Sequence, residues 1–208
     1  MSRLVIIGAS AMGRETSAYA CECGMVVKGF LDSRTDILDG QSGYAPVLNS
    51  PEEYTPESED VFVCAVGDPL AKRKYVQLFD SRGAKFASVI HPKAYVGANV
   101  KIGVGCIVAP NASITNDSVI GDHVIVNVNA SVCHDNVIGD FTTICPGCCL
   151  AGRVKVGADV FIGAGAVIIP DISLGAGMLV AAGAVVTHTF PEKVMVAGVP
   201  AECKKRLV

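Results

Sequence analysis

The residues best suited to chemistry in this chain stand together in Cys133-His134-Asp135-Asn136. An imidazole can accept and return a proton near neutral pH, which makes histidine the usual general base. The carboxylate of Asp135 can fix the tautomer of the neighbouring ring and raise its basicity. We therefore predict that His134 is a base. The alternative is a solvated histidine in a surface turn.

The chain has three other histidines. His91 precedes Pro92 at a junction between two sequence patterns, where a structural role is expected. His188 stands near the end of a repeat and is expected to be exposed. His123 follows Gly121-Asp122 in a turn-like segment, where a solvated polar side chain is expected.

The nine cysteines form no complete metal motif. Cys145-Pro146-Gly147-Cys148 has the CxxC spacing, but a tetrahedral zinc site needs a second such pair. We predict that these cysteines are packing residues and reduced thiols. A nucleophilic Cys133 activated by His134 is an alternative. It is weakened because neighbours on a strand point to opposite faces.

A second chemical signal is Gly8-Ala9-Ser10-Ala11-Met12-Gly13, which follows the apolar run Leu4–Ile7. It is similar to the glycine-rich turn that holds phosphates at a helix start, with Ser10 in place of the middle glycine. Asp32 lies 24 residues after Gly8, near the place where an acidic residue meets a ribose. The alternative is a tight strand-to-helix turn without a ligand. The short half-domain favours a mononucleotide over NAD.

From residue 90 onward an aliphatic residue recurs at every sixth position. Seventeen consecutive positions from Ile90 to Val186 hold Ile, Val or Leu without a break. This period fits neither a helix nor a hairpin ladder, but it fits a short strand followed by a tight corner of Gly, Asn or Asp. Three strands would close one coil of about 18 residues, and the coils would stack at about 4.8 Å. We therefore predict a parallel β-helix with the aliphatic residues inside.

The first 89 residues have the pattern of a small Rossmann-like α/β domain. Strands are expected at Leu4–Ile7, Val26–Leu31, Val61–Val66 and 86–90, and helices from residue 14 to about 23 and from about 70 to 81. The segment 33–58, with its prolines and acidic residues, is expected to be a solvated loop. We predict two domains, 1–89 and 90–208.

Composition excludes several classes of protein. The 208 residues are 50% hydrophobic and 18% charged, which is enough apolar content for a folded core. The net charge of −3 argues against binding nucleic acid or anionic membranes. No run of about 18 apolar residues is free of Gly, Pro or charge, as a membrane span would be. The apolar run Leu4–Ile7 is too short for a signal peptide, so we expect a cytoplasmic protein.

Taken together, these segments resemble the bacterial nucleotide-aminosugar acetyltransferases, also called the sialic-acid O-acetyltransferase family. The resemblance covers nearly the whole chain. It rests on Gly8–Gly13, Leu31-Asp32, Ala65-Val66-Gly67-Asp68, Ile90-His91-Pro92, Asn127, the run from His134 to Asp140, and the run from Ala197 to Ala201. It implies a left-handed β-helix, acetyl-CoA as cosubstrate, no metal, and a homotrimer with active sites between subunits.

The resemblance also implies roles for single residues. His134 would be the general base, Asp135 its acidic neighbour, and the N–H of Gly152 would meet the thioester oxygen. The sugar nucleotide would contact Ser10, Ala11, Met12, Asp32, Ser33 and Gly67, and Asn127 would face the sugar. Acetyl-CoA would contact Thr143, Gly152, Ala164, Ala182 and Pro200, with Lys204, Lys205 and Arg206 near its phosphates. Family members often carry histidine where Met12 stands, and some where Thr143 stands.

The reaction implied by the resemblance is N-acetylation of the 4-amino group of a UDP-, dTDP- or GDP-linked 4-amino-4,6-dideoxy sugar. O-acetylation of a sugar hydroxyl, as in sialic acid, is not separated from it by the sequence. A non-catalytic trimeric scaffold that binds sugar nucleotides is a further alternative. A zinc hydratase of the γ-carbonic-anhydrase type is another, although no two histidines have its spacing of four.

Overall fold

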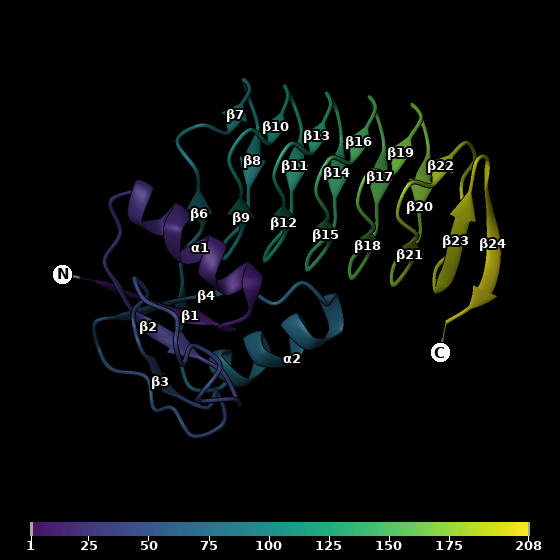
Figure 1. The fold of residues 1–208 in the computed structure, drawn as a ribbon. Coiled ribbons are helices and arrows are strands. Elements are labelled where there is room, and N and C mark those ends of the chain that lie inside the picture. Colours follow the sequence, from purple (N-terminus) through teal and green to yellow (C-terminus); the bar gives the residue numbers. More distant parts are fainter. Residues whose placement is uncertain (1, 208) are drawn as a thin grey trace.

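A computed structural model describes residues 2–207 of the chain. An α/β part formed by the N-terminal residues lies beneath one end of a long β-helix, and the C-terminal strands close the other end (Figure 1). Of the two helices in the described residues, neither has the length and apolar character needed to cross a lipid bilayer.

The N-terminal sheet is parallel, with strand order β3-β2-β1-β4-β5. Its strands are β1 (Arg3–Ile7), β2 (Val27–Leu31), β3 (Val47–Asn49), β4 (Asp60–Cys64) and β5 (Lys85–Phe86). Helix α1 (Ala11–Glu22) connects β1 to β2, and α2 (Pro69–Asp80) connects β4 to β5. The strand order reverses next to β1, and the carboxyl ends of strands at such a point form the usual ligand crevice of this fold.

Two details of the N-terminal prediction were wrong. Segment 33–58 is not only loop, because β3 pairs with β2 at the edge of the sheet. The single strand expected over 86–90 is two strands. β5 ends the N-terminal sheet at Phe86, and β6 (Val89–Ile90) already pairs with a strand of the β-helix. The division into domains 1–89 and 90–208 stays a prediction, and β6 straddles it.

The β-helix is built from two-residue strands on three faces, and each strand ends at one of the predicted aliphatic positions. The covered face holds β6 (Val89–Ile90), β9 (Ile107–Val108), β12 (Ile125–Val126), β15 (Thr143–Ile144), β18 (Phe161–Ile162) and β21 (Leu179–Val180). The second face holds β7 (Tyr95–Val96), β10 (Ser113–Ile114), β13 (Ser131–Val132), β16 (Cys149–Leu150), β19 (Val167–Ile168) and β22 (Val185–Val186). The third face holds β8 (Lys101–Ile102), β11 (Val119–Ile120), β14 (Val137–Ile138), β17 (Lys155–Val156) and β20 (Ser173–Leu174).

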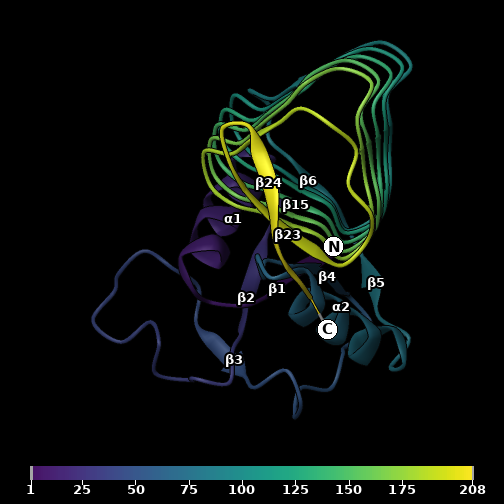
Figure 2. The same cartoon turned by 90° about the vertical axis from the view of Figure 1, so that its right-hand side faces the viewer.

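From β6 to β19, each strand pairs in parallel with the strand 18 residues further on, as Ile114 does with Val132. Seen along its axis, the β-helix is a three-sided prism (Figure 2). The predicted aliphatic residues from Val108 to Val186 are buried within it. The corners turn through residues of positive φ at every sixth position, among them Asn111, Asp117 and Gly147. Most of these corner residues are Asn, Asp or Gly, which tolerate this conformation best, as predicted. His123, Phe141 and Arg153 are exceptions at equivalent positions.

The prism has three edges, and each edge is a column of corners. The first edge joins the covered and second faces and includes residues 127–130. The second edge joins the second and third faces and includes residues 133–136. The third edge includes residues 139–142. The C-terminal strand β23 (Val194–Gly198) continues the covered face, and β24 (Ala201–Arg206) returns antiparallel beside it.

The N-terminal part packs against the covered face and the third edge (Figures 1 and 2). Val89, Ile107 and Ile125 share a core with residues of β1 and α1. Arg73 of α2 makes two hydrogen bonds to the Asp159 carboxylate, at 2.8 and 2.7 Å. These contacts leave the second edge free of the N-terminal part.

Candidate active site

His134 lies on the second edge, in the corner between β13 and β14. The corner turns through Asp135, whose φ is +60°. Nδ1 of His134 lies 2.7 Å from Oδ2 of Asp135, and both side chains are 53% exposed. Because the carboxylate accepts a hydrogen bond from the Nδ1–H group, Nε2 is left as the basic nitrogen of the neutral ring. Nε2 has no hydrogen-bond partner within residues 2–207, so it is available to a substrate.

Gly152 follows His134 by one complete coil, and the imidazole lies over it. A Cβ on Gly152 would stand 2.6 Å from both Cε1 and Nε2 of His134. Within the described residues the Gly152 N–H has no acceptor. The equivalent N–H of Ala98 donates to Oδ1 of Asn116 at 3.0 Å, whereas Pro170 offers Gly152 no such oxygen. An unpaired N–H beside the imidazole suits a developing oxyanion.

A cavity of 390 Å³ lies outside the carboxyl ends of β1, β2 and β4, and its lining includes Ser10, Asp32, Ser33 and Gly67. Gly8 has φ +98°, and a Cβ on Gly13 would collide with the Gly8 carbonyl. Both glycines are therefore needed for α1 to start this close to β1. Ser10 is the N-cap of α1, and its hydroxyl makes no capping hydrogen bond. The first N–H groups of a helix are a ready site for a phosphate.

Asp32 is buried at the base of this cavity, where one carboxylate oxygen accepts the N–H of Ala9 at 3.0 Å. The other accepts the N–H of Arg34 at 3.0 Å and its guanidinium at 3.2 Å. Burial alone would raise the pKa of Asp32. The hydrogen bonds from Ala9 and Arg34 outweigh burial and hold this pKa below its usual range. Asp32 is thus an anion that ties the turn after β1 to the end of β2.

Ala11 and Met12 open helix α1 next to this cavity. The Met12 sulfur lies 3.8 Å from Nδ2 of Asn127, on the first edge of the prism. The structure thus brings together two residues of the predicted sugar-nucleotide site that lie 115 positions apart.

The residues predicted for acetyl-CoA do not share one surface, and Gly152 lies on the second edge, beside His134. Ala164 and Ala182 are exposed at equivalent places on the first edge, and Pro200 and Lys204 are exposed in the C-terminal hairpin. Thr143 does not share that surface. It is buried on the covered face, where its hydroxyl accepts a hydrogen bond from Lys72 at 3.0 Å.

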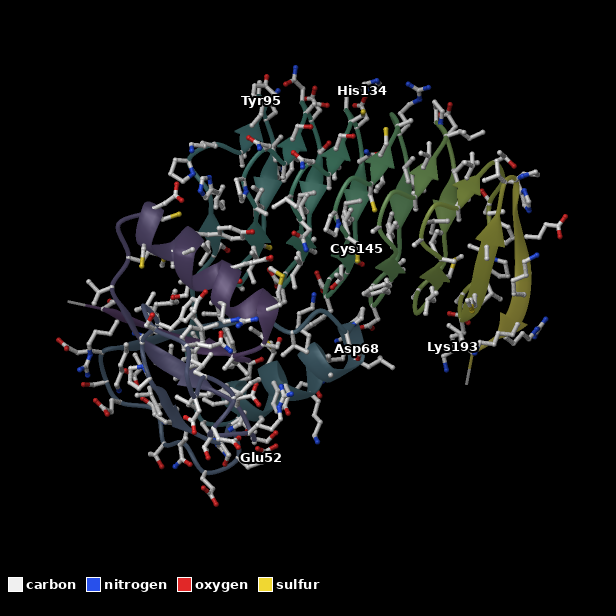
Figure 3. All side chains as sticks on the ribbon, in the orientation of Figure 1. Glu52, Asp68, Tyr95, His134, Cys145 and Lys193 are labelled. Carbon is white, nitrogen blue, oxygen red and sulfur yellow. The ribbon has the colours of Figure 1, made fainter. Side chains whose placement is uncertain are left out.

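One chain does not bring all these groups together. His134 and Gly152 occupy the second edge, whereas Asn127, Ala164 and Ala182 occupy the first. Figure 3 shows His134 on the side of the β-helix that faces away from the N-terminal part.

The other histidines are differently placed. His91 is buried, with Nε2 3.0 Å from a Glu22 carboxylate oxygen, and His188 is exposed, both as expected. The expectation that His123 is solvated was wrong. Its ring is 6% exposed and stacks on Phe141, with 5.1 Å between centroids, because the N-terminal part covers this corner. Burial lowers the pKa of His123, and its Nδ1 has no hydrogen-bond partner.

The cysteines are all unpaired. Cys148 is buried in the β-helix core, as predicted. Burial raises the pKa of Cys133, which opposes its use as a thiolate nucleophile. Within residues 2–207, no three His, Cys, Asp or Glu side chains are grouped to hold a metal ion.

A second cavity, of 460 Å³, adjoins His134 and Asp135, and its other lining residues are Tyr95, Thr115, Asn116 and Asp117. The sequence reasoning did not single these out. The signal was present, because Asn116 and Asp117 precede His134 and Asp135 by one coil of 18 residues and must therefore lie beside them.

Comparisons with known proteins agree with this arrangement. The family described as the PglD N-terminal domain matches residues 3–79. The acetyltransferase domain of PglB from Neisseria gonorrhoeae is 32% identical, with a TM-score of 0.91 over 98% of this chain and 100% of that chain. The same domain solved with acetyl coenzyme A gives 32% and 0.89, over 97% and 98%.

A variant of the GDP-perosamine N-acetyltransferase from Caulobacter crescentus, solved with CoA and GDP-perosamine, is 30% identical. Its TM-score is 0.91, over 99% of this chain and 98% of that chain. No curated protein matches. The chain belongs to the bacterial nucleotide-aminosugar N-acetyltransferases of the hexapeptide-repeat, left-handed β-helix class. It is therefore an acetyltransferase, which excludes the non-catalytic scaffold.

Proposed function

We propose that the protein transfers the acetyl group of acetyl-CoA to the 4-amino group of a nucleotide-linked 4-amino-4,6-dideoxy sugar. One observation carries the proposal. A histidine that is fixed by a carboxylate keeps its free nitrogen directly beside an unpaired backbone N–H. This arrangement supplies a base for the amine and a donor for the thioester oxygen within the same few ångströms.

In the proposed reaction, the neutral amine attacks the thioester carbonyl carbon, and Nε2 of His134 accepts a proton from the nitrogen. Asp135 keeps the ring in the required tautomer and stabilises the imidazolium. The carbonyl oxygen becomes an oxyanion that the Gly152 N–H binds. The C–S bond then breaks, and the CoA thiolate leaves with the proton from the imidazolium.

We further propose that two chains complete each site within a homotrimer. The sugar nucleotide would bind in the cavity beside Asp32, with its phosphates at the start of α1 and its sugar directed past Met12 and Asn127. The pantetheine arm of acetyl-CoA would follow Ala164 and Ala182, with Pro200 and Lys204 further along. Since these groups lie on the first edge and His134 on the second, a closed ring can use both edges of every chain.

The base is tested by His134→Ala, with His188→Ala as the matched control on an exposed histidine outside the site. We expect His134→Ala to lose on the order of 10²- to 10⁴-fold in kcat, and His188→Ala to stay within twofold. The assay mixes acetyl-CoA with UDP-, dTDP- and GDP-linked 4-amino-4,6-dideoxy sugars and detects the product by mass spectrometry. Unchanged turnover by His134→Ala would contradict the role.

Sharing of the site between chains is tested by mixing two inactive variants. His134→Ala destroys the second-edge half, and Asp32→Ala destroys the nucleotide half. If different chains supply the two halves, co-expression regains a substantial fraction of wild-type activity, because some sites combine two intact halves. No recovery in mixed oligomers would place each site within one chain.

The same panel separates N- from O-acetylation when it includes the 4-hydroxy analogue of each sugar. Preferential acetylation of the hydroxyl would replace the proposed reaction by O-acetylation.

We propose a cytoplasmic location, because both substrates are metabolites of the cytoplasm. The expected setting is synthesis of a bacterial surface glycan.

A further inference from the structure

The cavity beside His134 lies on one side of the ring only. Counted along the prism, Tyr95, Thr115, Asn116 and Asp117 belong to the coils before His134, whereas Gly152 belongs to the coil after it. Figure 3 shows Tyr95 and His134 along the same side of the β-helix. A ligand in this cavity therefore reaches the imidazole from the N-terminal side.

Asn116 and His134 occupy equivalent corner positions one coil apart. The cavity between them is open because their side chains lean in opposite directions. Asn116 leans toward the N-terminal end, where its Oδ1 accepts the N–H of Ala98 at 3.0 Å and lies against Gly97. His134 leans toward the C-terminal end, over Gly152. Neighbouring coils are only about 4.8 Å apart, so parallel side chains would fill this space.

Two carboxylates line this cavity: that of Asp135, which is hydrogen-bonded to His134, and that of Asp117. Oδ1 of Asp117 accepts Nδ2 of Asn99 at 2.9 Å, which fixes the carboxylate. Its Oδ2 has no partner within residues 2–207. The Tyr95 hydroxyl is likewise unpaired there, and the Tyr95 side chain is exposed. A fixed carboxylate with one free oxygen is a strong acceptor for a hydroxyl donor.

We propose that the sugar ring of the acceptor occupies this cavity, and that Asp117 selects it by accepting a hydrogen bond from the hydroxyl on the ring carbon next to the amine-bearing carbon. The inference rests on the proposed function and adds a specificity-determining residue to it. Acetyl-CoA, running along the C-terminal coils, reaches the Gly152 side of the ring. The amine must then arrive from the opposite side, and the adjacent hydroxyl faces the coil of Asp117.

The test combines a change in the enzyme with a change in the substrate. The acceptor is the panel sugar nucleotide that is turned over, and its partner is the analogue lacking that hydroxyl, the 3-deoxy sugar. With wild-type protein we expect the analogue to lose about 10- to 100-fold in kcat/KM, because it leaves a charged acceptor unpaired. With Asp117→Gly, the two substrates should differ by less than threefold.

Glycine suits this position, because Asp117 has φ +61°. Asp117→Asn keeps the shape of the side chain and should give an intermediate loss. The KM for acetyl-CoA should stay within twofold in both variants. The matched control is Asp171→Gly, which removes the same side chain from the same kind of corner, φ +65°, three coils further on. It should keep the wild-type preference for the hydroxyl.

Equal use of both substrates by the wild type, or an undiminished preference in Asp117→Gly, would overturn the inference. Either result leaves the proposed function standing, because the parent sugar is still acetylated. Absence of turnover with every panel member would overturn the proposed function and, with it, this inference.

Discussion

Gly152→Ala is predicted to slow the enzyme on the order of 10²-fold without unfolding it. The new Cβ would lie 2.6 Å from Cε1 and Nε2 of His134, about 1 Å closer than an ordinary carbon–carbon or carbon–nitrogen contact. The three nearest atoms all belong to this exposed ring, so the ring moves rather than the backbone. A displacement of about 1 Å at a reacting group costs on the order of 10²-fold in rate.

The N–H of residue 152 survives in Gly152→Ala, so the predicted loss measures the position of the ring alone. The double variant with His134→Ala is the control. Once the ring is absent, the three atoms nearest to the methyl group are gone, and Gly152→Ala should cost less than twofold more. Rates should be followed by loss of the thioester, because exposed Cys21 and Cys203 would consume a thiol reagent. The reasoning fails if Gly152→Ala keeps more than half of wild-type activity, or if its effect is undiminished without the ring.

Two further predictions concern buried titratable groups at the junction. Since burial lowers the pKa of His123 below its unfolded value near 6.5, its contribution to stability is complete above that value and is lost as the pH falls through the folded pKa. His123→Asn should therefore shrink the fall in melting temperature between pH 7.5 and 5, and an equal fall in both proteins would contradict this. Burial also lowers the pKa of Lys72 from 10.5 to about 8, so its charge opposes folding at pH 7 by about 3 kcal/mol. Lys72→Met should raise the free energy of unfolding at pH 7 by about 1–3 kcal/mol, and this gain should decline between pH 8 and 10.5. Urea titrations at several pH values measure the gain. A gain that does not change with pH would mean that better packing, and not loss of the charge, is its cause.

The β-helix can be predicted from the sequence because the position of each residue in it depends only on nearby residues. Each inward residue, such as Val132 or Leu150, has its place fixed by its neighbours within one hexad. The same periodicity predicts which residues lie side by side, since positions 18 apart form a column. His134 over Gly152 could have been found in this way, and so could Asn116 and Asp117.

Long-range packing explains what the sequence did not reveal. His123 has the sequence context of a solvated corner, and only the N-terminal part, packed on that corner, buries it. Lys72 stands in an ordinary amphipathic helix, and nothing local indicates that it faces the β-helix. β3 is a short edge strand in a segment rich in turn residues, where propensity is weak. The use of two different edges for one reaction is likewise a matter of arrangement in space.

The regular stacking of the coils also fixes distances along the axis of the β-helix. Each coil of 18 residues adds about 4.8 Å along the axis. The number of coils between Gly152 and the C-terminal hairpin therefore sets the distance from the hairpin to the reacting carbonyl. Deleting one whole coil would shorten that distance by about 4.8 Å and leave every inward-facing position unchanged. Deleting a single residue would instead rotate all later columns out of line, turning aliphatic side chains toward water. Insertions and deletions within the regular coils should therefore come only in complete coils. The last coil is the exception, because Val180 pairs with Val196 only 16 positions further on and both stay buried, so a corner there absorbs the change in length.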